Sequence, residues 1–104
     1  MVIQMIKYNI RPEKAAEYAT WAQAAIPILL SAPGIVEIQV YNNVIGTSQV
    51  TSMYYFNDLT GFATFRSNDA VDKVGTEAWQ YIENVHAELL GPSPFALEPL
   101  RPQR

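Results

Sequence analysis

Apolar and polar positions change their period along the chain, and these changes predict the order of its elements. Residues 2–10 are rich in β-branched and aromatic side chains, which is typical of a strand. After Arg11-Pro12, apolar residues recur at steps of three and four in one stripe: Tyr18, Trp21, Ala22, Ala25 and Leu29. This spacing predicts an amphipathic helix that begins near Pro12 and ends at Pro33-Gly34. Pro27 lies inside the pattern, so we expect a kink or a tightened last turn there.

Two β-rich segments follow the helix. From Ile35 to Asn42 the side chains alternate, so that two sets face opposite ways: Val36, Ile38 and Val40 against Glu37, Gln39 and Tyr41. The second segment, Gln49 to Phe56, comes after a turn-like stretch that contains Gly46, and together they predict a hairpin. The sequence leaves the register open, because a slip of one residue would exchange the two faces of the later strand.

Helical signals dominate the next part of the chain. Asp58 is placed to cap a short helix, and Ser67-Asn68-Asp69 interrupts it. Beyond Gly75, four apolar residues recur at helical spacing: Ala78, Ile82, Val85 and Leu89. We therefore expect a second helix, capped by Thr76, that ends before Gly91-Pro92.

The last expected strand runs from Phe95 to Leu100. Pro99 places it at a sheet edge or a strand end, because proline has no ladder donor. The predicted order is β-α-β-β-α-β, which folds as a split βαβ, ferredoxin-like α+β domain with its antiparallel sheet covered by helices on one face. One domain over residues 1–104 fits this length. The other sheet face stays bare, and its side chains are not polar enough to face water alone.

Composition and net charge indicate which kinds of molecule this chain binds. A charged fraction of 16% beside a hydrophobic fraction of 49% indicates a buried interface in so small a chain, and favours a homodimer. The net charge of -3 and the lack of a Lys/Arg cluster argue against nucleic acid and against an anionic membrane. No apolar stretch is long enough to span a bilayer, no signal peptide is recognisable and cysteine is absent, so we expect a cytoplasmic location.

Four segments, spread over essentially the whole chain, carry a resemblance to a known family: Ile10-Arg11-Pro12-Glu13-Lys14, Pro33-Gly34-Ile35, Tyr55-Phe56-Asn57-Asp58 and Leu97-Glu98-Pro99-Leu100. With these segments the chain resembles the dimeric α/β barrel superfamily, and most closely its antibiotic biosynthesis monooxygenases. The resemblance implies a homodimer whose two ferredoxin-like sheets join face to face into a barrel. It also implies a small apolar or aromatic ligand between the sheet and the helices.

Haem-degrading members of this superfamily use an Asn on the first strand with a Trp and a His on the later helical region. In this chain Asn9 comes one residue late relative to Ile10-Arg11-Pro12, while Trp79 and His86 fall on a helix after the one expected to supply the Trp. We therefore transfer none of these roles and expect no cofactor. A metal site is not expected either, because His86 is the only histidine and the carboxylates lack ligand spacing.

His86 is the candidate proton acceptor, since histidine titrates closest to neutral pH. Tyr41 is the second candidate catalytic residue. The candidate substrate-binding residues are Glu37, Gln39, Tyr54 and Trp79. Each has a structural alternative. His86 suits a helix surface or an interface, the polar face of the strand suits solvent, and aromatic residues suit the core.

Motifs for nucleophiles, phosphate loops and paired carboxylates are absent, so the sequence does not support hydrolysis or phosphoryl transfer. Our first hypothesis is a cofactor-independent monooxygenase that acts on an aromatic or polyketide-like compound. There the substrate is deprotonated to an electron-rich anion that reacts with oxygen itself, and the protein supplies a dry pocket and hydrogen-bond donors. The alternative is a non-enzymatic dimer that binds a metabolite or has a stress-related role.

Overall fold

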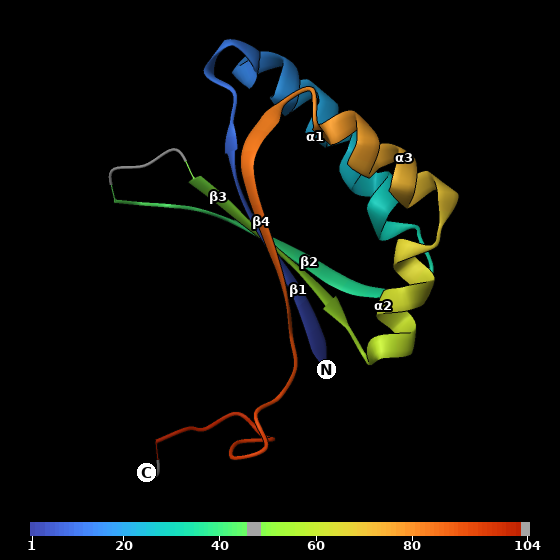
Figure 1. Cartoon of the computed structure of the whole chain (residues 1–104), viewed down its shortest axis with the longest axis vertical. Helices are drawn as coiled ribbons and strands as arrows, with labels where there is room; N and C mark the ends of the chain where they lie inside the picture. The colour runs from blue at the N-terminus through green and yellow to red at the C-terminus, as the bar shows by residue number, and fades with distance from the viewer. Residues whose placement is uncertain (46–48, 103–104) are drawn as a thin grey trace.

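The computed structural model describes residues 1–45 and 49–102. Its elements run in this order: β1 (Val2–Ile10), a 3-10 turn (Pro12–Lys14), α1 (Ala15–Leu30), β2 (Ile35–Asn42), β3 (Gln49–Phe56), α2 (Leu59–Arg66), α3 (Asp69–Ala78) and β4 (Ile82–Leu90). The four strands of the described chain form one antiparallel sheet in the order β2-β3-β1-β4. All helices lie on one side of this sheet (Figure 1). The predicted α+β, ferredoxin-like fold is confirmed.

The end of α1 is built by proline and glycine. Pro27 lies inside the helix, and the Ser31 N–H reaches the carbonyls of both Pro27 at 3.1 Å and Ile28 at 3.3 Å, so the last turn is tightened as expected. Gly34 follows with a φ of 94°, which side chains rarely adopt. A Cβ there would lie 2.2 Å from the carbonyl oxygen of Gly61. Glycine thus allows the turn before β2 to pack directly on α2.

Side-chain caps fix the starts of the next two helices. Asp58 Oδ1 accepts from the Gly61 N–H at 2.8 Å, and this confirms the predicted cap of α2. Asn68 caps α3 by accepting from the Ala70 and Val71 N–H groups. Thr76 is not a cap, because it lies inside α3 and its hydroxyl donates to the Asp72 carbonyl.

Residues 82–90 form strand β4 instead of the predicted helix. The helix was predicted wrongly because the strand contains a β-bulge. β4 pairs Glu83 with Asn9 and His86 with Lys7, so it uses one more residue than β1 between these pairs. Asn84 takes up the bulge with a φ of 55°, a conformation that asparagine tolerates better than most residues. The bulge shifts the side-chain alternation by one, and a strand then shows helix-like apolar spacing.

The strand expected from Phe95 to Leu100 is not formed. Residues 91–102 leave the sheet after β4 and extend away from the helices (Figure 1), with one isolated bridge between Ser93 and Ala96. Phe95 is 97% exposed, so this segment buries little apolar surface. The edge position predicted for the last strand belongs to β4.

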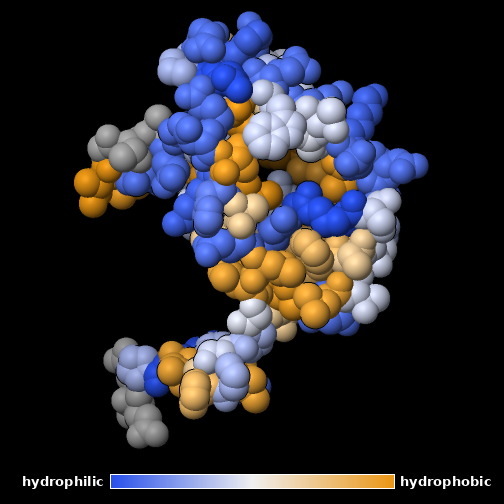
Figure 2. Space-filling model, viewed as in Figure 1, coloured by the Kyte–Doolittle hydropathy of each residue, from blue (hydrophilic) through white to orange (hydrophobic). Residues whose placement is uncertain are grey.

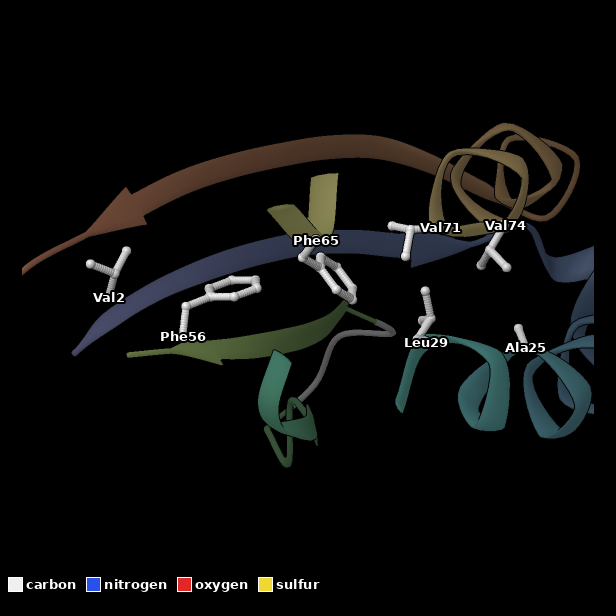
Figure 3. Close-up of a cluster of buried hydrophobic side chains, with 7 residues drawn as sticks. All are labelled: Val2, Ala25, Leu29, Phe56, Phe65, Val71 and Val74. Carbon is white, nitrogen blue, oxygen red and sulfur yellow. The ribbon is translucent and has the colours of Figure 1, made fainter. Parts of the chain in front are cut away.

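The register of β3 decides which side chains reach the core. Val50, Ser52 and Phe56 are buried on the helix side, while Met53 and Tyr55 lie on the opposite, open face of the sheet. Figure 3 shows the seven side chains of the larger buried cluster, which come from both sheet and helices: Val2, Ala25, Leu29, Phe56, Phe65, Val71 and Val74. Full burial of Phe56 and Phe65 contributes roughly 1.5–3 kcal/mol each.

Two further predictions from the sequence concern the turn between β2 and β3 and the possibility of a membrane-spanning segment. The turn predicted at Gly46 lies outside the described residues. In the part of the chain that is described, none of the helices combines the length and the apolarity needed to cross a membrane.

Candidate functional site

A cavity of about 360 Å³ lies between the covered face of the sheet and the helices. All four strands and all three helices of the described chain supply residues to its wall. Figure 2 shows a hollow on this side of the molecule, with hydrophobic surface inside it and hydrophilic residues beside it. Cavities of this size and composition hold small organic ligands.

One wall of the cavity is aromatic. Trp21 of α1 stacks on Tyr81 with ring centroids 5.2 Å apart, and its Nε1 donates to Glu77 Oε1 at 3.2 Å. Tyr18 packs against both rings. Trp79 follows the end of α3 and also lines the cavity, although it is 59% exposed. Tyr81 supports Trp21 from outside the cavity wall, and the flat faces of Tyr18, Trp21 and Trp79 that line it are suited to a ring compound.

A chain of hydroxyl groups crosses the wall from sheet to helix. The hydroxyl of Tyr8 lies 2.7 Å from that of Tyr18 and 3.3 Å from Ser52 Oγ. Tyr8 and Ser52 are buried, and all three residues line the cavity. Burial, and then the hydrogen bond with Tyr8, raises the pKa of Tyr18 far above its usual value, so the phenol is neutral at neutral pH. The chain can donate to or accept from a ligand without carrying charge.

The positively charged side chain of Arg66 lies at the α2 side of the cavity. The guanidinium of Arg66 lies over the rings of Tyr54 at 5.3 Å and Phe65 at 5.1 Å, and Nη2 donates to Gln4 Oε1. Its Nε is buried and has no hydrogen-bond partner among the residues that the structure describes. Burial lowers the pKa of Arg66, against the opposing influence of Tyr54, but an arginine remains charged at neutral pH. Burial likewise raises the pKa of Tyr54.

The sheet divides the predicted site residues into two groups. Tyr54 and Trp79 line the cavity. Three others lie on the open face of β2 and bond to one another: Glu37, Gln39 and Tyr41. Gln39 Nε2 donates to Glu37 Oε2 at 2.8 Å, and the Tyr41 hydroxyl donates to Gln39 Oε1, so these groups form one polar strip away from the cavity.

His86 also lies on the open face, in β4 and not on the expected helix. Its side chain is 66% exposed, and Nε2 is 3.8 Å from Glu88 Oε2. Because His86 pairs with Lys7, which faces away from the helices, the imidazole points away from the cavity. The residues predicted as one site therefore fall into two groups, two of them at the cavity and four on the open sheet face.

The sequence-based site did not include Arg66 or the three residues of the hydroxyl chain, Tyr8, Tyr18 and Ser52, and all four line the cavity. Tyr18 belongs to the apolar stripe of the predicted helix, and its polar end gave no separate signal. A role for Ser52 could be predicted only if the register of β3 were known, because the register decides which face of the sheet carries its side chain. Arg66 occupies the last turn of α2, where a cation is favourable next to the helix dipole and needs no ligand to explain it.

Comparison of the solved structures finds several similar folds. SnoaB, a cofactor-independent oxygenase from Streptomyces nogalater, aligns with a TM-score of 0.75 at 11% identity, over 88% of this chain and 92% of that one. A NIPSNAP domain protein from Burkholderia xenovorans aligns with a TM-score of 0.68 at 19% identity, over 92% and 98%. A conserved protein from Methanosarcina mazei Go1 gives 0.73 at 15%, over 86% and 91%. At these identities the likeness is one of fold.

Sequence comparison gives a more specific result. No curated protein matches the sequence of this chain. The model of the antibiotic biosynthesis monooxygenase family, however, matches residues 1–75, from β1 into α3. That segment holds most of the cavity wall, including the hydroxyl chain and Arg66. The chain belongs to the antibiotic biosynthesis monooxygenase family.

Proposed function

We propose that this protein is a cofactor-independent monooxygenase that oxidises an aromatic or polyketide-like compound in the cavity. The observation that carries the proposal is the hydroxyl chain of Tyr8, Tyr18 and Ser52, which faces an otherwise mainly apolar space of about 360 Å³. Family membership and the fold shared with SnoaB support the reaction class.

The reaction that suits such a cavity converts an activated methylene to a ketone. The substrate loses a proton, the carbanion gives its electrons to O₂, and a C–O bond forms to give a hydroperoxide. Loss of water then leaves the carbonyl, so one CH₂ and one O₂ become one C=O and one H₂O. The substrate supplies all the electrons, and the protein has to bind it, exclude water and stabilise its anion.

The residues of the cavity divide this work. Tyr54 and Trp79 keep their proposed substrate-binding roles as ring faces against a flat compound. The phenol of Tyr18 donates to the substrate oxygen on which charge develops. Tyr8 supports this role, because its hydroxyl can donate to the Tyr18 oxygen and so leave the Tyr18 proton free for the substrate.

We also propose a homodimer that joins through the open sheet face, as the resemblance implies. This face mixes apolar and polar side chains, among them Met5 and Met53 at its centre. The proposed roles of His86, Tyr41, Glu37 and Gln39 then belong to that interface or to a ligand held there, not to the cavity. The lack of cysteine agrees with the proposed cytoplasmic location.

The test begins with thermal-shift screening of hydroxyaromatic compounds and quinones, followed by oxygen uptake with each compound that raises the melting temperature. A substrate should consume one O₂ per ketone formed, without added cofactor. Tyr18→Phe should lower turnover at least tenfold, because one positioned donor is commonly worth about 10²–10³ in rate. Tyr81→Phe, whose ring lies beside Trp21, is the matched control. A ligand that stabilises the protein without oxygen uptake would favour the non-enzymatic binding dimer.

A further inference from the structure

We propose that Arg66 makes the cavity selective for an aromatic ligand that carries a carboxylate. The inference rests on the proposed function only in using the same cavity, since it concerns binding and not oxidation. It names a substrate class: a flat ring compound whose acidic group pairs with the guanidinium while the ring lies beside Tyr54.

The first support is the balance of charge around Arg66. Three contacts within 4.0 Å join a basic and an acidic side chain among the described residues, and none involves Arg66: Arg11 with Glu83, Lys14 with Glu17 and His86 with Glu88. Arg66 therefore holds a partly buried positive charge with no carboxylate within 4.0 Å in the part of the chain that is described. A cation in such surroundings is costly unless it is paired, so the position favours an incoming anion.

Unused donors are the second support. A guanidinium has five N–H groups, and within residues 1–45 and 49–102 a single one donates, from Nη2 to Gln4 Oε1. The Nε N–H is buried without a partner in the described part of the chain, which is an unfavourable state for a strong donor. A carboxylate accepts two parallel N–H bonds from arginine. Binding one in the cavity would let the guanidinium turn and pair its Nε.

The third support is the platform beneath the cation. Phe65 is fully buried, and the guanidinium lies over its ring and over that of Tyr54. Contact with aromatic faces is favourable for the planar guanidinium and leaves its edge for an anion, a geometry that lysine reproduces only in part. Because Tyr54 and Arg66 line the same cavity, a ring that packs on the Tyr54 side brings its carboxylate to Arg66.

Asp72 is the opposing charge among the residues that line the cavity. It makes no ion pair with Arg66 in the described chain. Its negative charge disfavours an acid close to α3, and so directs the carboxylate toward α2. Asp72→Asn is therefore a matched variant: it changes a charge in the same cavity, in the opposite direction.

Binding of 1-naphthoate and of its neutral isostere 1-naphthamide, measured by calorimetry at pH 7, tests the proposal. The wild type should bind the acid roughly tenfold more tightly than the amide, as expected for a charge-assisted pair. Arg66→Met should abolish that preference, Arg66→Lys should keep part of it, and Asp72→Asn should keep or increase it. Melting temperatures of the variants show that each is folded, and Arg66→Lys carries the test if Arg66→Met is not.

Equal binding of acid and amide by the wild type, or no binding of either, would overturn the proposal. The proposal would also be overturned if folded Arg66→Met kept the preference for the acid and Arg66→Lys kept it in full. The carboxylate would then have another partner. Oxygen uptake separates this inference from the proposed function. Selective binding of acids with no oxidation of any ligand would leave the Arg66 site standing and remove the monooxygenase, and oxidation of neutral compounds alone would do the reverse.

Discussion

At the scale of single residues, the Tyr8 hydroxyl is the middle member of the hydroxyl chain in the cavity wall and contacts both Tyr18 and Ser52. Tyr8→Phe leaves the buried Ser52 Oγ without this partner and removes the 2.7 Å contact to Tyr18. We expect the free energy of unfolding to fall by roughly 1–2 kcal/mol, because a hydrogen bond is lost and a buried hydroxyl is left unpaired. Urea denaturation followed by circular dichroism measures it.

Tyr81→Phe is the matched control for Tyr8→Phe. The Tyr81 ring stacks on Trp21, and its hydroxyl has no hydrogen-bond partner within the described residues. Removal of that hydroxyl should change stability by less than about 0.5 kcal/mol. Equal effects of the two substitutions would show that the hydroxyl chain adds nothing to the fold.

The raised pKa of Tyr18 predicts a loss of stability in alkali. A tyrosine that holds its proton more tightly in the folded state than in the unfolded state contributes stability that is complete below the unfolded pKa, about 10. Above that pH the unfolded state loses its proton first, so the free energy of unfolding falls as pH rises. Tyr18→Phe should show a shallower decline between pH 9.5 and 11 in urea denaturation. An unchanged slope would place the effect on other tyrosines, Tyr54 first.

At the scale of elements, two glycines predict opposite outcomes for the same change. Gly34→Ala places a Cβ against the Gly61 carbonyl at a φ of 94°, where strain alone is on the order of 1–3 kcal/mol, so we expect a loss of at least that size. Gly75→Ala lies in the interior of α3 with no atom within 4 Å of the new Cβ, and should stabilise by about 0.5–1 kcal/mol. Thermal and urea unfolding compare both. A stable Gly34→Ala would contradict the close contact between the β2 turn and α2.

Elements whose side-chain period is undisturbed could be predicted from the sequence. The bounds of β2 and β3 agree with the alternation, and Asp58 caps α2 as expected. β4 could not be predicted, because the bulge at Asn84 inserts one residue and leaves Ile82, Val85 and Leu89 at helical steps. That error also moved the last strand to Phe95–Leu100, where apolar residues lie in a segment outside the sheet.

The candidate site was less predictable than the fold, since it depends on which face each strand turns to the helices. Tyr54 and Trp79 were identified as ring faces, and both line the cavity. His86 and Tyr41 were selected for their chemistry, which says nothing of the sheet face that carries them. Arg66 had no periodic signal, and its unpaired Nε appears only when α2 is packed over Tyr54.

At the scale of the whole molecule, the sheet separates two surfaces with different proposed partners. The helix side holds the cavity and a small ligand. On the open side, Met53 of β3 lies between Met5 of β1 and Gln39 of β2, near the middle of the sheet. A second copy joined there would bury these side chains and leave the cavity of each chain intact.

Met53→Glu tests that arrangement, because a two-fold axis through the sheet face would bring two new carboxylates close together in a desolvated interface. Light scattering at micromolar concentration should give the wild type a mass of twice 11.7 kDa, and Met53→Glu a mass near that of one chain. Leu59→Glu is the control, since Leu59 is 63% exposed at the start of α2 on the other side, and it should stay dimeric. A monomeric wild type, or a folded Met53→Glu that remains a dimer, would rule out the open face as the interface.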